Sequence, residues 1–513
     1  MASDNVRVAK NTLVLYFRMI ITLVVSLFTS RVVLQALGVE DFGIYNVVGG
    51  IVASLSFLQQ TLVMCFQRYF CKFIPHKNYK KLSEILGAAT YIILAINVFV
   101  VLIVETIGIW FLNSKLLIPE ARLTAANWVL QLSLLTFIFT IFRAVYNAVI
   151  ISFEEMTVFA YISILEVVLK LVVAFLVTCL AYDHLILYAI LMLLVAILTS
   201  FVYYAFVRNK YSFIKHDFTV IKDKCIFKEL GSFMGFSTVG TMANVLKSQG
   251  LNFVLNMFYG PVVNAARSIS LQVYTAVSSF THSFQTAFSP NMMKRCETDT
   301  NEQIERTVHA VSKYSFYAMM MLSLPIMIYS REILELWLGK DNVPELASFF
   351  TVVFLMIGLI ETLSNPIVNV IFAKGRIKGF MLSISSVLLA VIPLSYVALL
   401  LGMDARAVYL LDLLLSIMAQ LFRIIYLKRI FSFSVWSYII NVIAPITIIL
   451  AYSFLLCMCV PLIGNTIGCI VAGTVISEIS YLGFVYFFGI KKYERIFLNA
   501  KIAQYVTKYR KSH

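Results

Sequence analysis

The chain has 513 residues, of which 61% are hydrophobic and 13% are charged. Soluble proteins are roughly 45–50% apolar and about 25% charged, so this composition excludes an ordinary soluble enzyme. Lys and Arg total 41 against 26 Asp and Glu, a net charge of +15 that topology, an anionic partner or both must explain.

Fourteen apolar runs follow one another along the chain, and each is long enough to cross a hydrocarbon core. They fall at about 11–30, 43–66, 85–112, 126–150, 158–182, 185–207, 231–258, 262–288, 311–330, 348–372, 379–401, 406–427, 437–460 and 466–488. The first run follows a polar, basic N-terminus and lacks a signal-peptide cleavage pattern, so we expect it to be retained. The sequence therefore predicts an all-α integral membrane protein with 14 transmembrane helices.

The basic residues of the loops predict the sidedness of these helices. With the N-terminus placed in the cytoplasm, the cytoplasmic segments carry 28 Lys and Arg and the external segments carry five. This is the positive-inside pattern, and it predicts that both termini are cytoplasmic. Most of the excess positive charge is thereby explained by topology. The basic tail at 489–513 has an apolar stripe and is predicted to be an interfacial helix on anionic membrane lipids.

The cysteines and histidines indicate no metal site. Eight cysteines occur, none with paired metal-ligand spacing to histidines, so we read them as small apolar residues of helices. The sequence predicts no disulfide framework, no metal and no cofactor.

Eight basic residues remain within or at the edges of the apolar runs. An ionised side chain near the bilayer centre costs about 2.5–3.5 kcal/mol even on lenient scales, so we expect these residues to face water or one another. The basic residues are Arg18, Arg31, Arg143, Lys170, Lys247, Arg267, Lys313 and Arg423, and acids in comparable places are Glu105, Glu166, Glu361, Asp412 and Glu478.

Some of these charges have simple structural interpretations. Lys313 and Arg423 lie near cytoplasmic ends and can extend to the interface. Glu166 and Lys170 are four residues apart on one helix and can pair. Arg18 and Lys247 have no acid one helical turn away, and they are the stronger functional candidates.

Three polar stripes at helical spacing accompany these cations. They consist of Arg18, Thr22, Ser26 and Ser30; of Asn244, Ser248, Asn252 and Asn256 beside Lys247; and of Ser270, Tyr274, Ser278 and His282 after Arg267. A single stripe can simply join helices by hydrogen bonds. Three stripes with cations predict a hydrophilic, positively charged interior, in which hydroxyls and amides suit sugars and Arg and Lys suit phosphate.

A weak internal repeat divides the chain. A shift of 222 residues places Thr22, Ser26 and Ser30 on Asn244, Ser248 and Asn252, and Leu37-Gly38 on Tyr259-Gly260. Because both copies start inside, the repeat is parallel, and its pseudo-two-fold axis lies along the membrane normal. The predicted parts are a six-helix lobe at 1–207, a basic linker at 208–230, a second six-helix lobe at 231–430, two further helices at 431–488 and the tail at 489–513.

Two stretches of the sequence resemble a known family. The segment RVVLQALGVEDFGIY at 31–45 resembles the first external turn of bacterial polysaccharide flippases of the multidrug/oligosaccharidyl-lipid/polysaccharide (MOP) exporter superfamily. The segments YGPVVNAAR at 259–267 and AFSP at 287–290 are similar to the corresponding second-lobe sequences.

The resemblance implies a flippase without enzymatic activity. Such proteins carry an isoprenoid-pyrophosphate-linked oligosaccharide from the cytoplasmic to the periplasmic leaflet of the bacterial inner membrane by alternating access. Its implied partners are the lipid-linked oligosaccharide, membrane lipids and the polymerase and glycosyltransferases of the same O-antigen, lipopolysaccharide or other polysaccharide pathway, with no nucleic acid.

On this basis we expect basic side chains to bind the pyrophosphate of the cargo, and hydroxyl and amide side chains to assist them. Transport is expected to be coupled to H⁺, Na⁺ or the membrane potential, with Glu166, Asp412 or His282 as candidate proton carriers. The expected cargo-binding residues are Arg18, Arg31, Lys247, Arg267, Arg143, Lys170, Ser26, Asn244, Ser248, Asn252, Tyr274 and His282.

Two alternative functions stay open at this stage. A drug or metabolite exporter of the same superfamily would favour an acidic cavity, whereas the runs here carry eight basic and five acidic residues. A membrane glycosyltransferase or polymerase could use the acidic pair Glu40-Asp41. The loop around that pair is too short to build an active site, and a turn followed by a helix start explains it equally well.

Overall fold

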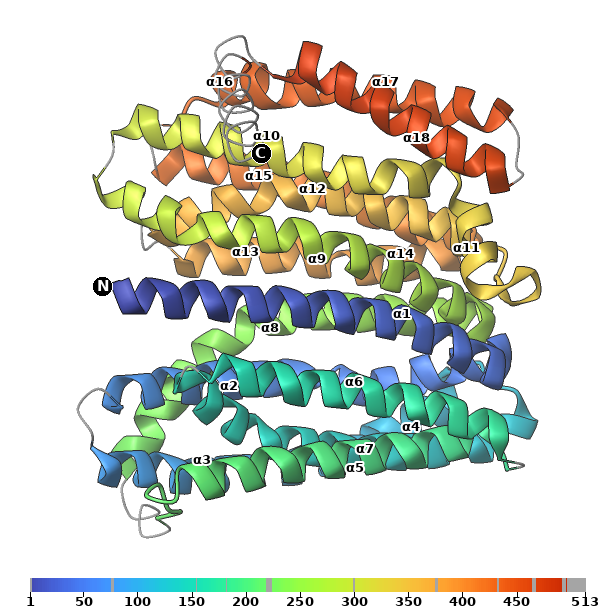
Figure 1. Cartoon of the computed structure of the whole chain (residues 1–513). Coiled ribbons are helices and arrows are strands. Elements are labelled where there is room, and N and C mark those ends of the chain that lie inside the picture. Colours follow the sequence, from blue (N-terminus) through green and yellow to red (C-terminus); the bar gives the residue numbers. More distant parts are fainter. Residues whose placement is uncertain are drawn as a thin grey trace, which may run out of the picture. The chain divides into compact units, whose positions relative to one another are not determined.

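The computed structural model describes residues 2–74, 78–153, 155–180, 182–217, 224–298, 300–373, 377–430, 433–463, 467–490 and 495. Within these ranges every regular element is a helix and no strand occurs (Figure 1), which confirms the predicted all-α class. Eleven helical segments of the described chain are long and apolar enough to cross a bilayer, so this is a multi-pass membrane protein. The count of fourteen stays a prediction, because the runs 43–66, 231–258 and 262–288 are not separate members of this set.

The chain forms two compact units, which divide it within α9, α11, α13 and α15. Unit 1 comprises Met1–Ser268, Trp337–Leu346 and Met381–Val408, and unit 2 comprises the remainder. These units are defined by contacts between residues, and the predicted lobe and linker boundaries stay a prediction. The predicted tail helix at 489–513 lies outside the described residues except for 489, 490 and 495.

Unit 1 contains the first eight helices, the whole of α14 and parts of α9, α11, α13 and α15. Within it α1 packs on α6, α5 packs on α7, and α2 packs on both α5 and α8. The helices of this unit are α1 (Ala2–Ala53), α2 (Ser56–Phe73), α3 (Tyr79–Ile103), α4 (Ile109–Lys115), α5 (Glu120–Ser152), α6 (Met156–Cys179), α7 (His184–Lys210), α8 (Lys224–Tyr259), the start of α9 (Pro261–Thr298), most of α13 (Ile377–Leu389), α14 (Val391–Leu400) and the start of α15 (Ala405–Ile430).

Small side chains allow the helices of unit 1 to pack closely. Ala126, Ala144 and Ala148 are fully or almost fully buried on α5, among larger side chains such as Phe66 and Phe70 of α2. Membrane helices have no hydrophobic drive to associate within lipid, so close van der Waals contact of this kind supplies much of their stability. α5 is thereby fixed at the centre of the unit.

Glycine permits the two sharp turns that the repeat aligns. Gly38 interrupts α1 with φ 76°, and Gly260 separates α8 from α9 with φ 73°. A positive φ is costly for residues with a Cβ, which explains glycine at both positions. The two turns are 222 residues apart, the spacing of the predicted parallel repeat.

The segment after α7 folds back onto α3. The backbone N–H of Lys215 donates to Ser83 Oγ at 3.1 Å, and Thr90 Oγ1 lies 3.0 Å from His216 Nδ1. A Cβ on Gly87 would lie 2.0 Å from the carbonyl oxygen of Asp217, so glycine is required for this approach. The first part of the predicted basic linker is thus bound to unit 1.

Unit 2 contains the remaining helices. α10 packs on α12 and also contacts α17 and α18, which lie beside it (Figure 1). Its N-terminus is closed by a capping box between Thr300 and Gln303. The further helices of this unit are α10 (Asn301–Ile328), α11 (Ser330–Leu338, of which the last two residues belong to unit 1), α12 (Ala347–Ala373), α16 (Val435–Tyr438), α17 (Ala444–Cys459) and α18 (Ile467–Phe484).

One glycine of unit 1 provides a test of this packing. A Cβ at Gly43 would lie 2.0 Å from the carbonyl oxygen of Pro261, so Gly43→Ala should force α1 and α9 apart at a cost of about 1–3 kcal/mol. We expect a lower melting temperature of the purified protein in detergent. Gly231→Ala is the matched control, because a Cβ there meets nothing within 4 Å. Equal melting temperatures for the two variants would contradict the close approach.

Candidate functional site

Three cations and one carboxylate gather between the membrane helices of unit 1. Arg143 of α5 donates from Nη1 to Glu166 Oε2 of α6 at 2.9 Å and to Thr199 Oγ1 of α7 at 3.0 Å. Lys170, one turn further along α6, lies 2.8 Å from Glu166 Oε1. The predicted pairing of Glu166 with Lys170 is confirmed, and the carboxylate serves Arg143 as well.

Arg18 supplies the third cation. Its guanidinium lies 4.8 Å from the centre of the Phe159 ring, and Nη1 is 3.5 Å from Ser163 Oγ. Within the described chain, no carboxylate lies within salt-bridge distance of Arg18, and its buried Nε has no hydrogen-bond partner. Its charge is therefore supported by an aromatic ring and a hydroxyl but not neutralised.

Tyr203 of α7 connects these groups. The Arg143 guanidinium lies 5.8 Å from the centre of its ring, and the phenol is close enough to interact electrostatically with Arg18, Arg143 and Glu166. We call the set formed by Arg18, Arg143, Glu166 and Lys170 the charge cluster. With three cations and one carboxylate it carries an excess of positive charge.

A second group of polar residues joins α8 to the start of α9. Arg267 is 4% exposed and donates from Nη2 to the backbone oxygen and Oγ of Ser248, at 2.7 and 2.8 Å. Asn252 is 2% exposed, accepts from Asn264 and donates to the backbone oxygen of Asn46. These bonds give Ser248, Asn252 and Arg267 the helix-joining role that a polar stripe can also serve.

The other predicted residues of unit 1 lie on the same helices. Lys247 on α8 and Arg31 on α1 are half-buried, whereas Asn244 and Ser26 are exposed. Their cargo contacts stay a prediction.

The predicted residues of unit 2 occupy a different environment. Tyr274 of α9 donates to Glu361 of α12, and Asp412 of α15, 4% exposed, interacts electrostatically with the same phenol. His282 is exposed on α9. Arg423 was expected to extend toward the interface, yet it donates to Ser364 Oγ at 2.8 Å within unit 2. Lys313, expected to do the same, is only 3% exposed.

Solved structures share this fold. A lipid II flippase MurJ in an inward closed conformation superposes with a TM-score of 0.70 at 16% identity, covering 94% of this chain and 98% of its own. An inward-facing multidrug resistance MATE family transporter of the MOP superfamily gives a TM-score of 0.69 at 12% identity. The match covers 80% of this chain and 94% of the transporter. A MOP-superfamily transporter from Pyrococcus furiosus gives a TM-score of 0.57 at 14% identity, and its binding pocket is described as having reverse polarity. The match covers 82% of this chain and 95% of that transporter.

The chain has the fold of MOP-superfamily transporters. At these identities the likeness concerns the fold. No protein-family model matches the sequence, and no curated protein matches it.

Several partners of these cations were not predicted from the sequence. Thr199 and Tyr203 of α7 and Ser163 of α6 contact the cations, but each looks like an ordinary polar residue of an apolar helix. Thr199 and Tyr203 are four residues apart, so they share one face of α7. That spacing was the available signal.

A second ion cluster lies at the helix ends that we predict to be external. Arg122, at the start of α5, pairs with Asp41 of α1 and with Asp183, which precedes α7 and is 2.7 Å from Arg122 Nη1. Asp183 Oδ1 also accepts from the backbone N–H groups of Leu185 and Ile186 and so caps α7. The acidic pair Glu40-Asp41 thereby receives a structural explanation, since Asp41 is neutralised by Arg122.

The pKa of Asp183 reflects these contacts. Partial burial alone would raise the pKa of this carboxyl, but the hydrogen bonds from Arg122 and the Ile186 N–H, with the charge of Arg122, lower it below its usual 3.8. A carboxyl whose pKa is depressed by folding stabilises the protein above its unfolded-state pKa of about 3.9. That contribution to stability is lost as the pH falls through the pKa that the carboxyl has in the folded protein.

We therefore expect Arg122→Gln to lower the free energy of unfolding at pH 7 by about 1 kcal/mol, because partly exposed ion pairs are weakened by solvent. The variant should also lose less stability than the parent below about pH 3.9. Melting temperatures in detergent across this pH range measure both effects. Arg406→Gln is the control, since its pair with Asp404 is longer, at 3.4 Å, and both side chains are exposed. Parallel pH profiles for the parent and Arg122→Gln would exclude this role.

Proposed function

We propose that the protein is a flippase that carries an isoprenoid-pyrophosphate-linked oligosaccharide across the bacterial inner membrane by alternating access, for the synthesis of a cell-surface polysaccharide. The observation that carries this proposal is the charge cluster. It keeps Arg18 without a carboxylate partner inside a membrane unit whose fold is that of transporters. The loop charges predict that both termini are cytoplasmic, and this orientation is part of the proposal.

The physical argument starts from the cargo. A pyrophosphate cannot enter hydrocarbon unpaired, because burial of an isolated charge is prohibitive. Arginine offers planar, multiple donors to phosphate and keeps its charge at all relevant pH values. A cluster with three cations and one carboxylate can therefore exchange its contacts with water for contacts with the pyrophosphate.

Glu166 moderates this attraction. It bonds to Arg143 and Lys170, so the cations avoid part of the cost of an uncompensated charge. Cargo binding would weaken these pairs, and release would restore them. A flippase needs such reversibility because its substrate must leave as readily as it enters.

The coupling ion and the partner enzymes belong to this proposal as well. Glu166 and Asp412 are the acids that we propose for coupling to H⁺ or Na⁺, and a membrane potential would act on the charge of the cargo itself. The partners are the glycosyltransferases and polymerase that make and use the lipid-linked glycan. The protein itself is proposed to transport and not to catalyse.

The alternative is a drug or metabolite exporter of the same fold, as in the MATE family. Cationic drugs would be repelled by a cluster with this excess of positive charge. Anionic metabolites would not be repelled, so the lipid linkage has to be tested directly.

Neutralising single cations tests the proposal. We expect Arg18→Gln, Arg143→Gln and Lys247→Gln each to lower the rate of lipid-linked oligosaccharide transport about tenfold or more, since a charge-assisted hydrogen bond contributes roughly 1.5–3 kcal/mol. The measurement is arrival of the glycan at the far leaflet of proteoliposomes, read by a lectin added outside. Arg143→Gln should fold normally, because Glu166 keeps Lys170 as its partner.

Arg306→Gln is the control for loss of positive charge, because Arg306 is 75% exposed and its ion pair within the described residues is with its helical neighbour Glu302. Parental rates in both Arg18→Gln and Lys247→Gln would reject a cationic route for the cargo.

A further inference from the structure

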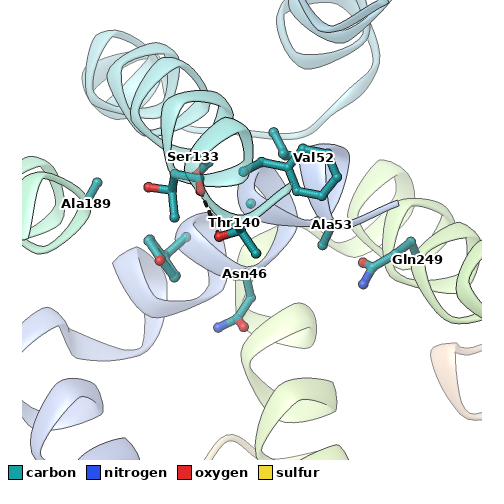
Figure 2. Close-up of a pocket in the computed structure, with 12 residues that line it drawn as sticks. Asn46, Val52, Ala53, Ser133, Thr140, Ala189 and Gln249 are labelled. Carbon is teal, nitrogen blue, oxygen red and sulfur yellow. Dashed lines mark hydrogen bonds between the residues drawn. The ribbon is translucent and has the colours of Figure 1, made fainter. Parts of the chain in front are cut away.

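Unit 1 contains a cavity that the charge cluster does not occupy. Its volume is about 340 Å³, within the usual range for sites that bind small ligands. Its walls come from α1 beyond Gly38, α5, α7 and α8. In Figure 2, Asn46 of α1, Ser133 and Thr140 of α5 and Gln249 of α8 surround the open space.

The cavity wall is polar but uncharged. Among the described residues that line it there is no Lys, Arg, His, Asp or Glu. Ser133 and Gln249 line it without a hydrogen-bond partner elsewhere in the described chain. The hydroxyl of Thr140 donates to the backbone oxygen of Thr136 at 2.8 Å and keeps its lone pairs as acceptors.

Apolar faces complete the wall. The aromatic rings of Tyr45 and Phe137 line the same space. A sugar ring has hydroxyl groups at its edge and C–H groups on its faces, so it requires both kinds of surface. An inorganic ion or a charged drug would find no opposite charge here.

The cavity and the charge cluster lie along the same helix face. Ser133, Thr136 and Thr140 precede Arg143 on α5 at spacings of three, four and three residues, which keep them on one side of a helix. At about 1.5 Å per residue, Arg143 lies roughly 5 Å along the axis from Thr140 and roughly 15 Å from Ser133.

The neighbouring helix α7 repeats this order. Ala189 lines the cavity and Thr199, ten residues later, binds Arg143, the same spacing that separates Ser133 from Arg143 on α5. Both helices therefore place the uncharged cavity on the side of the cluster that we predict to be external.

We infer that this cavity binds the uncharged sugar attached directly to the pyrophosphate, while the charge cluster holds the pyrophosphate. This inference rests on the proposed function and names its glycan-binding site. A sugar joined to a pyrophosphate requires its two sites close together, and Thr140 and Thr136 lie about one and two helical turns from Arg143 on α5. Discrimination among cargoes would then come from Ser133, Thr140 and Gln249, and the general attraction from the cations.

Binding of two lipids, one with the sugar and one without it, tests the two sites separately. The dissociation constant of the purified protein is measured by native mass spectrometry for undecaprenyl pyrophosphate and for undecaprenyl-pyrophosphoryl glucose. We expect the glucosyl lipid to bind more tightly to the parent protein. Thr140→Val should weaken binding of the glucosyl lipid about two- to tenfold, the effect of one hydrogen bond, and leave the sugar-free lipid unchanged.

Gly49→Leu tests the space itself. A Cβ at Gly49 would meet only Ser133 Oγ, at 3.9 Å, so the larger side chain can enter the cavity without a backbone clash. It should remove the advantage of the glucosyl lipid altogether. Arg143→Gln should weaken both lipids equally. Thr106→Val is the matched control for Thr140→Val, because Thr106 is exposed and its hydroxyl donates likewise to the backbone four residues earlier.

The outcomes distinguish failure of the sugar site from failure of the proposed flippase function. Equal dissociation constants of the parent protein for the two lipids would reject the sugar site. The site is also rejected if Thr140→Val and Gly49→Leu leave both dissociation constants unchanged or change both to the same extent. In either case the flippase proposal stands. If the parent binds neither lipid, the proposed function fails, and the sugar site fails with it.

Discussion

The cost of an ionised group in hydrocarbon is the constraint on which the interior of unit 1 depends. Each such charge costs about 2.5–3.5 kcal/mol or more unless it is paired or hydrated. Arg143 and Lys170 meet that cost by sharing Glu166, whereas Arg18 contacts the Phe159 ring and, at a longer distance, Ser163, and no carboxylate of the described chain pairs with it. A membrane protein that retains such a residue keeps a binding capacity for an anion, and this links the packing of four helices to the proposed transport of a pyrophosphate.

The same helices separate charge from uncharged polarity. α5 contacts α1, α2, α6 and α7, and along one of its faces it presents first hydroxyls and then Arg143. Charged contacts attract any anionic lipid, because they act through charge and at distance. Hydroxyl and amide contacts discriminate by position, since an unmatched partner leaves a polar group unsatisfied. The proposed division of the cargo between two neighbouring sites rests on this difference.

The fold was largely predictable because long apolar runs and loop charges follow directly from the bilayer. The two glycine turns were also predictable, because Gly38 and Gly260 lie at the spacing of the predicted repeat. The i, i+4 pair of Glu166 and Lys170 was found because both residues lie on one helix. The contact of Arg143 with Glu166 and Thr199 was not predicted, because it joins three helices and depends on the rotation of each helix about its axis. Asn252 and Arg267 also bond to neighbouring helix groups, and sequence spacing alone does not distinguish a polar stripe that binds a ligand from one that joins helices.

The central claim is that the pyrophosphate is the part of the cargo that the membrane interior of this protein recognises. It is tested most directly by comparing two substrates in proteoliposomes of the unaltered protein: an undecaprenyl-pyrophosphate-linked oligosaccharide and the same oligosaccharide on an uncharged polyprenyl glycoside. The account predicts that the pyrophosphate-linked lipid is translocated about tenfold faster or more, in keeping with the roughly 1.5–3 kcal/mol of a charge-assisted contact. Equal rates for the two lipids, or transport of the uncharged lipid alone, would contradict it.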